Sequence, residues 1–315
     1  MKPDWHPSVS LENIARRAEA LAAVRNFFAA RHVLEVDVPV MARSTITDPN
    51  IETFLVSSPC SSTEKYYLTS SPEFFMKRLL VAGSGPIYYM GHAFRVEEKG
   101  SRHNPEFTII EWYRPEWTTA QLMQELAELV AKLLPCEMLR YTTYRQIFLD
   151  YLGVDPHQAG LAQLKVMGRE RLSPAFDSDD RNIWLDFLFS HLIEPQLQGM
   201  VFVEQFPASQ AALAKTFRDD YGNAVAARFE LYVDGLELAN GYEEEQDASV
   251  LSQRFESDRK LRKERGQPVP DTDRTFLAAM QEGLPACAGV ALGFDRLLML
   301  SLRARHISEV ISFAE

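Results

Sequence analysis

FRVEEKGSRHNPEFTIIEWY, residues 94–113, is the most informative stretch of the chain, because it has the pattern of two strands joined by a charged loop. After the loop, residues alternate with period 2, so Phe107, Glu111 and Tyr113 share one face. Arg95 precedes the loop, where a guanidinium can bind a phosphate or a carboxylate through two parallel hydrogen bonds. The pattern predicts a strand pair that holds a nucleotide, and an ordinary hairpin with a solvated loop is the alternative.

The composition is that of a globular chain. Its 315 residues, 46% of them hydrophobic, suffice for a substantial core. The sequence has no run of about 18 apolar residues, the length needed to span a bilayer, and its first residues lack the apolar stretch of a secretory signal. This predicts a cytoplasmic protein without membrane contact. The net charge of −11 argues against a broad nucleic-acid-binding surface. The cysteines form no C-x-x-C pair, so neither a disulfide framework nor a zinc site is expected.

Helical and strand patterns alternate around this stretch, which gives an α+β fold class. An amphipathic helix is predicted for residues 11–31 and a strand for residues 33–39, ending at a proline. Ser71 and Pro72 are expected to open a further helix, with Ser71 as its cap and Pro72 as its first residue. The carboxylate of Glu73 then lies at a helix start.

A single domain over residues 1–315 is the simplest organisation, because the chain has no internal repeat, low-complexity tract or long linker. Its middle part has mainly helical patterns and few residues of the types that catalyse reactions or bind ligands. This predicts a helical insertion at roughly residues 119–200.

A second hairpin is predicted around Asp234-Gly235, a dipeptide that favours a two-residue turn. The turn sets a register in which Glu230 lies opposite Ala239, and Glu230 and Glu237 are diagonal neighbours on one face. Two such carboxylates can share a magnesium ion, which prefers a few carboxylate oxygens together with substrate phosphates. An exposed strand face with two glutamates is the alternative.

Three acidic residues, Glu243, Glu244 and Glu245, follow this hairpin. A run of charges is usually a solvated helix entry. The functional interpretation is that one of these glutamates holds a cationic substrate group, and spacing does not choose among them.

Small residues alternate near the C-terminus, at Gly289, Ala291 and Gly293, and leave room for a flat ligand on one strand face. Arg296, in the first turn of the next predicted helix, could stack on that ligand. The chain contains neither G-x-x-x-x-G-K-[ST] nor G-x-G-x-x-G, which argues against a P-loop and a dinucleotide-binding fold.

Taken together, the proline-ended strand, the FRVEE and RHNPEFTIIEWY strands and the terminal GVALGFDR resemble the three ordered motifs of class II aminoacyl-tRNA synthetases. The strings SPE, RHNPEFT and ELANGYEE resemble lysyl-tRNA synthetases in particular, and the resemblance runs from about residue 12 to the end. Lysyl-tRNA synthetases carry an N-terminal anticodon-binding domain, and here the catalytic pattern begins almost at residue 1. The chain therefore resembles the shorter ligase family that attaches (R)-β-lysine to elongation factor P, and Ala291, where the synthetases have glycine, agrees.

The resemblance implies a catalytic core with an antiparallel sheet flanked by helices, a homodimer with the region of Pro39 at its two-fold axis, and no anticodon recognition. It implies an ATP-dependent ligase that activates lysine, with (R)-β-lysine favoured, as an adenylate and transfers it to a lysine ε-amine of elongation factor P. Charging of tRNA, or a catalytically silent module that binds amino acids, are the alternatives.

The resemblance also implies residue roles. ATP would be bound by Arg95, Val96, Glu97, Asn104, Phe107, Glu237, Leu238, Gly293 and Arg296, of which Arg95 and Arg296 would also be catalytic. The substrate would be bound by Ser71, Pro72, Glu73, Tyr113, Asn240, Glu244 and Ala291, and magnesium by Glu230 and Glu237. Phe107 and Arg296 would enclose the adenine, and Tyr113 with Glu244 would hold the side-chain ammonium. The role of Arg102 stays open.

Overall fold

The computed structural model describes residues 5–58, 61–96, 99–136 and 138–314. They form two compact units: unit 1 comprises Met1–Pro135 and Glu245–Glu315, and unit 2 comprises Cys136–Glu244. Helices pack on a sheet in each unit, which confirms the α+β fold class. The organisation as one domain with a helical insertion at roughly 119–200 stays a prediction.

Unit 1 contains a sheet with the strand order β1-β5-β6-β13. The bounds of these strands are β1 Leu34–Glu35, β5 Ile87–Phe94, β6 Glu106–Pro115 and β13 Cys287–Gly293. Only the β1–β5 pair is parallel; β5–β6 and β6–β13 are antiparallel. The strand predicted for residues 33–39 is shorter than expected, because its backbone pairing with β5 ends with the bond from Val36 N to Tyr88 O.

Strands β5 and β6 form the hairpin that the opening stretch predicts. Ile87 lies opposite Tyr113 at one end and Phe94 opposite Glu106 at the other. Along β6 the side chains alternate in direction, so those of Phe107, Glu111 and Tyr113 share a face.

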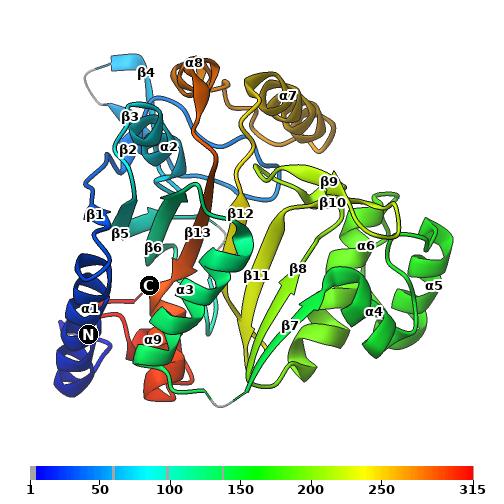
Figure 1. Cartoon of the computed structure of the whole chain (residues 1–315), viewed down its shortest axis with the longest axis horizontal. Helices are drawn as coiled ribbons and strands as arrows, with labels where there is room; N and C mark the ends of the chain where they lie inside the picture. Colours follow the sequence, from blue (N-terminus) through cyan, green and yellow to red (C-terminus); the bar gives the residue numbers. More distant parts are fainter. Residues whose placement is uncertain (1–4, 59–60, 97–98, 137, 315) are drawn as a thin grey trace. The chain divides into compact units, whose positions relative to one another are not determined.

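The helices of unit 1 form two groups (Figure 1). The first group consists of α1 Leu11–Ala29, α3 Thr119–Leu133 and α9 Phe294–Leu302, which contact one another; α9 packs on β6, α3 on β13 and α1 on β1. The second consists of α2 Glu73–Val81, α7 Ala248–Glu264 and α8 Arg274–Gly283. Stacking of the Phe74 and Phe276 rings, with centroids 4.2 Å apart, joins α2 to α8. A short 3₁₀ helix, η4 Ile307–Glu309, follows α9.

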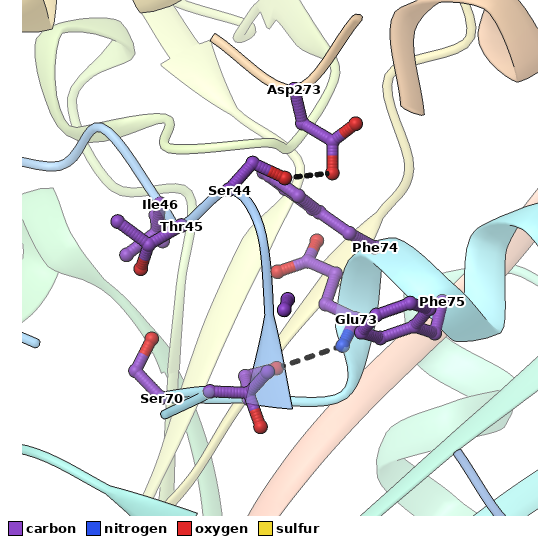
Figure 2. A pocket seen from close by; sticks show the side chains of 11 residues that line it. Ser44, Thr45, Ile46, Ser70, Glu73, Phe74, Phe75 and Asp273 are labelled. Atoms are coloured by element: carbon purple, nitrogen blue, oxygen red, sulfur yellow. Dashed lines mark hydrogen bonds between the residues drawn. The ribbon is translucent and has the colours of Figure 1, made fainter. Parts of the chain in front are cut away.

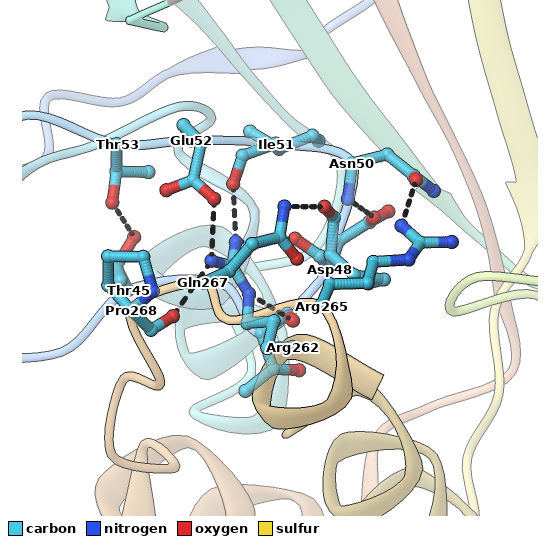
Figure 3. Close-up of polar contacts among 12 residues, drawn as sticks. Thr45, Asp48, Asn50, Ile51, Glu52, Thr53, Arg262, Arg265, Gln267 and Pro268 are labelled. Carbon is cyan, nitrogen blue, oxygen red and sulfur yellow. Dashed lines mark hydrogen bonds and ion pairs between the residues drawn. The ribbon is translucent and has the colours of Figure 1, made fainter. Parts of the chain in front are cut away.

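A smaller sheet in unit 1 has the order β2-β4-β3, with bounds β2 Met41–Ala42, β3 Leu55–Ser58 and β4 Ser61–Leu68. The loop between β2 and β3 is held by one buried arginine of α7, Arg262 (Figure 3). Its guanidinium donates to the carbonyl oxygens of Thr47, Asp48 and Ile51 and pairs with Glu52 at 2.9 Å. The carbonyl of Glu52 in turn accepts from Val96 N at 3.0 Å, so this loop also supports the backbone next to Arg95.

Unit 2 contains strands in the order β12-β11-β8-β7. Their bounds are β7 Leu139–Thr143, β8 Met200–Glu204, β11 Arg228–Val233 and β12 Leu236–Glu243, and a separate pair is formed by β9 Thr216–Arg218 and β10 Ala224–Ala226. The helices are α4 Tyr144–Leu152, α5 Leu161–Leu172 and α6 Arg181–Leu188, followed by the short η1 Phe189–Ile193, η2 Glu194–Gln196 and η3 Ala208–Gln210. An aromatic core that includes Tyr144, Phe148 and Trp184 holds them together.

The described part of the chain has no helix with both the length and the apolar character needed to cross a bilayer.

Candidate active site

A pocket in unit 1 lies at the start of α2, and the Glu73 carboxylate points toward its middle (Figure 2). The pocket is lined by Ala42, Ser44, Thr45, Ile46, Thr69, Ser70, Ser71, Glu73, Phe74, Phe75 and Asp273. Ser44 Oγ donates to Asp273 Oδ2 at 2.6 Å across one side. Acidic groups set among aromatic and hydroxyl side chains suit an organic cation with an apolar chain.

Ser71 and Pro72 lie one position earlier relative to the helix than predicted. The N-cap is Pro72, and α2 begins at Glu73. Ser71 Oγ still accepts from Glu73 N at 3.1 Å, and the same oxygen donates to Glu111 Oε2 at 2.7 Å. The hydroxyl of Ser71 therefore connects the helix start to a carboxylate of β6.

Glu111 is 2% exposed and lies at the centre of this network. Its other carboxylate oxygen accepts from the Tyr113 hydroxyl at 2.6 Å. Burial, together with the negative charge of Glu73, raises the pKa of Glu111 to about 7. A bound ammonium would stabilise the charged form of this carboxylate, so Glu111 is a candidate receptor for a cation.

The small residues of β13 lie beside this face. Gly289 is opposite Tyr113, Ala291 is opposite Glu111 and Gly293 is opposite Ile109. Directly opposed residues of antiparallel strands have Cβ atoms about 4.5–5.5 Å apart, so the methyl group of Ala291 borders the Glu111 carboxylate. The predicted stripe of small residues is thus next to the two β6 side chains that can bind an ammonium.

Two arginines of unit 1 provide positive charge for phosphates. Arg95 follows β5; its N–H donates to Pro105 O at 2.9 Å, and its guanidinium lies 5.2 Å from the ring centre of Phe107. Arg296 lies in the first turn of α9 and donates to Nε2 of His103, a residue of the loop between β5 and β6. One arginine thus lies at the start of the β5–β6 loop, and a second, from α9, contacts this loop at His103.

The neighbours of Phe107 and Arg296 anchor them. Asp295 accepts from Thr108 N at 2.7 Å and from Arg17 at 2.6 Å, and Arg17 also donates to Thr108 Oγ1 at 2.7 Å. This ion pair, in which Asp295 is buried and Arg17 partly buried, fixes the start of α9 against β6. It therefore sets the positions of the residues adjacent to Asp295 and Thr108, which are Arg296 and Phe107.

The other predicted ATP ligands near the β5–β6 loop are Asn104, Val96 and Glu97. Asn104 is buried and donates to Glu106 O at 2.7 Å, which shapes the end of the loop. Val96 has an exposed side chain. The predicted ligand Glu97 lies outside the described residues.

The carboxylate hairpin of unit 2 has the predicted turn, and its register differs beyond the turn. Tyr232 lies opposite Glu237 as expected, but Glu230 lies opposite Asn240 and not Ala239. The reason is a β-bulge at Leu238, which inserts one residue into β12. Glu230, Tyr232 and Glu237 nevertheless share one face.

Glu230 is a buried carboxylate with close partners. It forms an ion pair with Arg228 and accepts from the Tyr232 hydroxyl, and Arg228 also donates to Asn240 Oδ1 at 3.2 Å. Burial raises the pKa of Glu230 to about 7; Arg228 opposes this change and the charge of Glu237 adds to it. A divalent cation on this face would offset the repulsion between the charges of Glu230 and Glu237.

Burial distinguishes the three glutamates that spacing left equivalent. Glu243 pairs with Lys215 at 3.2 Å, and Glu245 pairs with Arg254 at 3.4 Å. Glu244 is 1% exposed, and its backbone forms an isolated bridge with Ala214. Of the three, Glu244 is the one that a solvated helix entry does not explain.

Comparison with known proteins gives the family. The model of class II tRNA synthetases of the D, K and N type matches residues 4–315. The chain belongs to this family. It is 45% identical to a protein of Hamiltonella defensa subsp. Acyrthosiphon pisum (strain 5AT), named elongation factor P–(R)-β-lysine ligase, over 98% of this chain and 97% of that protein. Proteins of the same name from Histophilus somni (strain 2336) and Pasteurella multocida (strain Pm70) are 44% and 42% identical, over 99% and 98% of this chain and 98% and 97% of theirs.

Membership in the class II synthetase family confirms the predicted fold class, whereas the individual site residues stay predictions. Within unit 1 the structure brings Ser71, Glu73 and Tyr113 into one network. The predicted site omitted Glu111, although the period of β6 already put it on the face of Phe107 and Tyr113. It also omitted Lys77 of α2, whose Nζ lies 2.5 Å from Glu73 Oε1. The spacing of Glu73 and Lys77 by four residues was the signal for this pair.

Proposed function

We propose that this class II synthetase-like chain uses ATP to activate lysine, with (R)-β-lysine favoured, and transfers it to a lysine ε-amine of elongation factor P. The observation that carries the proposal is identity of 42–45% along nearly the full length of relatives that have this name. The buried carboxylate network around Glu111 supports it, because both lysine isomers present ammonium groups that such a network can bind.

The proposed reaction has two steps. First, the lysine carboxylate attacks the α-phosphorus of ATP, and pyrophosphate leaves. Second, the acceptor amine attacks the carbonyl carbon of the adenylate; an amide bond forms, the amine loses a proton and AMP leaves. A protein nucleophile is not required, so the residues act by orienting the reactants and by neutralising charge.

The roles that we propose for the side chains are those that the resemblance to lysyl-tRNA synthetases implies. Arg95 would hold the α-phosphate and the substrate carboxylate, while Phe107 and Arg296 would enclose the adenine, with Val96, Asn104, Leu238 and Gly293 completing the ATP site. Glu73 and Asn240 would contact the amino and carboxylate end of the substrate. Its side-chain ammonium would be held by Tyr113 and Glu244, and we add Glu111 to this set because of its burial and its bond to Tyr113.

Magnesium fits the carboxylates of unit 2. No group of three or more acidic, histidine or cysteine side chains suited to a metal occurs among the described residues. Magnesium, however, is typically bound by one or two carboxylates together with substrate phosphates. Because both oxygens of Glu230 already accept bonds from Arg228 and Tyr232, the half-buried Glu237 would be the main ligand and Glu230 the second. When bound, the ion would neutralise phosphate charge.

A homodimer is also part of the proposal. The side chains of Leu34, Val40 and Met41, on either side of Pro39, are exposed to solvent in the single chain. Apolar side chains clustered at a surface are typical of an interface between proteins. A cytoplasmic location follows from the proposed acceptor, a translation factor.

The first step is tested by lysine-dependent exchange of pyrophosphate into ATP. We expect exchange with (R)-β-lysine and with L-lysine, with kcat/KM higher for the β-isomer by about tenfold, a factor that contacts to one displaced group can provide. L-Ornithine, which is one methylene shorter, should be poorer than L-lysine by about 10- to 100-fold. Exchange that is independent of every lysine isomer would refute the proposed substrate class.

A further inference from the structure

Lys77 is a lysine with a fully buried side chain, 0% exposed, in the middle of α2. A lysine is almost never fully buried unless its ammonium is paired with an anionic group. Its Nζ lies 2.5 Å from Oε1 of Glu73, which is one helical turn earlier. The ammonium is thus held against the carboxylate that faces the pocket.

The two partners differ in their exposure. The Glu73 side chain is 15% exposed and lines the pocket, whereas Lys77 lies behind it without contact to solvent. A pair of this spacing on a helix surface contributes little to stability. Stability alone also gives no reason to bury it, because a buried ion pair is often no more stable than apolar side chains of similar volume. A role in the pocket explains why a charge is present at this position.

A second carboxylate lies near the same pair. Ser71 Oγ bonds to both Glu73 N and Glu111 Oε2, and the charges of Glu73 and Lys77 act on Glu111 in opposite directions. The two carboxylates repel each other, and the ammonium of Lys77 offsets that repulsion.

We propose that Lys77 is a positioning residue for substrate: its ammonium binds Oε1 of Glu73 and fixes the orientation of that carboxylate in the pocket, so that Oε2 can accept the substrate amino group. The inference rests on the proposed function, because it takes lysine or β-lysine as the ligand of the pocket. Lys77 itself does not contact the substrate and acts through Glu73.

The test is a double-mutant cycle on lysine binding. We expect Lys77→Met to raise the KM for the preferred lysine isomer by about 10- to 100-fold, the factor for losing one hydrogen bond to a charged group, with the KM for ATP unchanged within about twofold. Glu73→Gln should have a similar effect. Because Lys77 acts through Glu73, the double variant should bind lysine within about threefold of Glu73→Gln alone. A purely structural role would lower kcat or melting temperature without this selective change in KM.

Arg78→Met is the matched control, because Arg78 is the next residue of α2 and its guanidinium lies over Phe75 at 5.6 Å. It should leave the KM for lysine unchanged. If Lys77→Met does not fold, the double variant, which removes both buried charges, is compared with Glu73→Gln. A double variant tenfold weaker than Glu73→Gln would overturn the inference, as would an unchanged KM in Lys77→Met. Isothermal titration with the lysine isomers separates the two hypotheses. If the wild type binds no lysine isomer, both the proposed function and this inference are refuted. If the wild type binds lysine and Lys77→Met binds it with the same affinity, the inference alone is refuted.

Discussion

Arg296→Ala is expected to reduce ATP–pyrophosphate exchange by about 100-fold or more. Removing one preorganised group that neutralises charge in a transition state typically has an effect of this size. The Asp295–Thr108 bond holds Arg296 at the start of α9, so its guanidinium is preorganised relative to β6. The rate is measured by exchange of labelled pyrophosphate into ATP at saturating lysine.

The fold should tolerate this substitution. A cation in the first turn of a helix opposes the helix dipole, so replacing it with alanine should leave the melting temperature unchanged or slightly higher. Arg303→Ala is the control, because Arg303 is an exposed arginine at the other end of the same helix. Near-normal exchange in Arg296→Ala, together with normal exchange in the control, would contradict the assignment of Arg296 to the nucleotide site.

Glu111→Gln is expected to weaken lysine binding by about 100-fold at pH 8, because the amide keeps the shape of the side chain but not the charge that pairs with an ammonium. The KM for ATP should change little. For the wild type, the pKa of about 7 predicts that the KM for lysine rises as the pH falls below 7, where Glu111 becomes protonated. Exchange kinetics with varied lysine concentration between pH 6 and pH 9 measure both effects.

The stability of the folded protein should depend on pH in the opposite direction to lysine binding: binding weakens as the pH falls, whereas the contribution of Glu111 to stability increases. The pKa of Glu111 in the folded protein, about 7, lies above the value of about 4.3 for a glutamate in an unfolded chain. Between these values the folded state binds more protons, so the contribution of Glu111 to the free energy of unfolding falls as the pH rises through this window. Relative to the wild type, Glu111→Gln should therefore gain melting temperature between pH 5 and pH 8.

The matched control for this variant is Glu128→Gln, a solvent-accessible glutamate of α3 that pairs with Arg31 at 2.7 Å. Its effect on lysine binding and on the pH dependence of stability should be small, since an exposed ion pair contributes little. A Glu111→Gln protein that binds lysine as tightly as the wild type would show that Glu111 does not hold the ammonium. A melting temperature that falls relative to the wild type at pH 8 would contradict the raised pKa.

The strands that carry the site followed from sequence periodicity where one face of a strand is buried. Residues 94–113 gave the β5–β6 hairpin, because alternation with period 2 determines which side chains share a face. The Asp234-Gly235 turn gave the first pairs of β11 and β12 correctly. The bulge at Leu238 shifted the following pairs by one residue, and no residue type in that strand marks a bulge in advance.

The candidate site was less predictable, because it depends on burial that spacing does not determine. The sequence did not indicate which of the three consecutive glutamates binds a substrate group. The folded chain shows that Glu244 is buried, whereas Glu243 and Glu245 have basic partners. Lys77 had the spacing of an ordinary surface ion pair with Glu73. Its burial follows from the packing of α2 in unit 1, which a single helix pattern does not reveal.

The destination of labelled lysine tests the proposed function directly. The protein is incubated with ATP, magnesium and labelled (R)-β-lysine or L-lysine, with elongation factor P and tRNA both present, and the label is located by acid precipitation, nuclease treatment and mass spectrometry. Elongation factor P with acetylated amines is the matched acceptor control. We predict label on one lysine of unmodified elongation factor P, resistant to nuclease and absent from the acetylated protein. Label on tRNA alone would contradict the account.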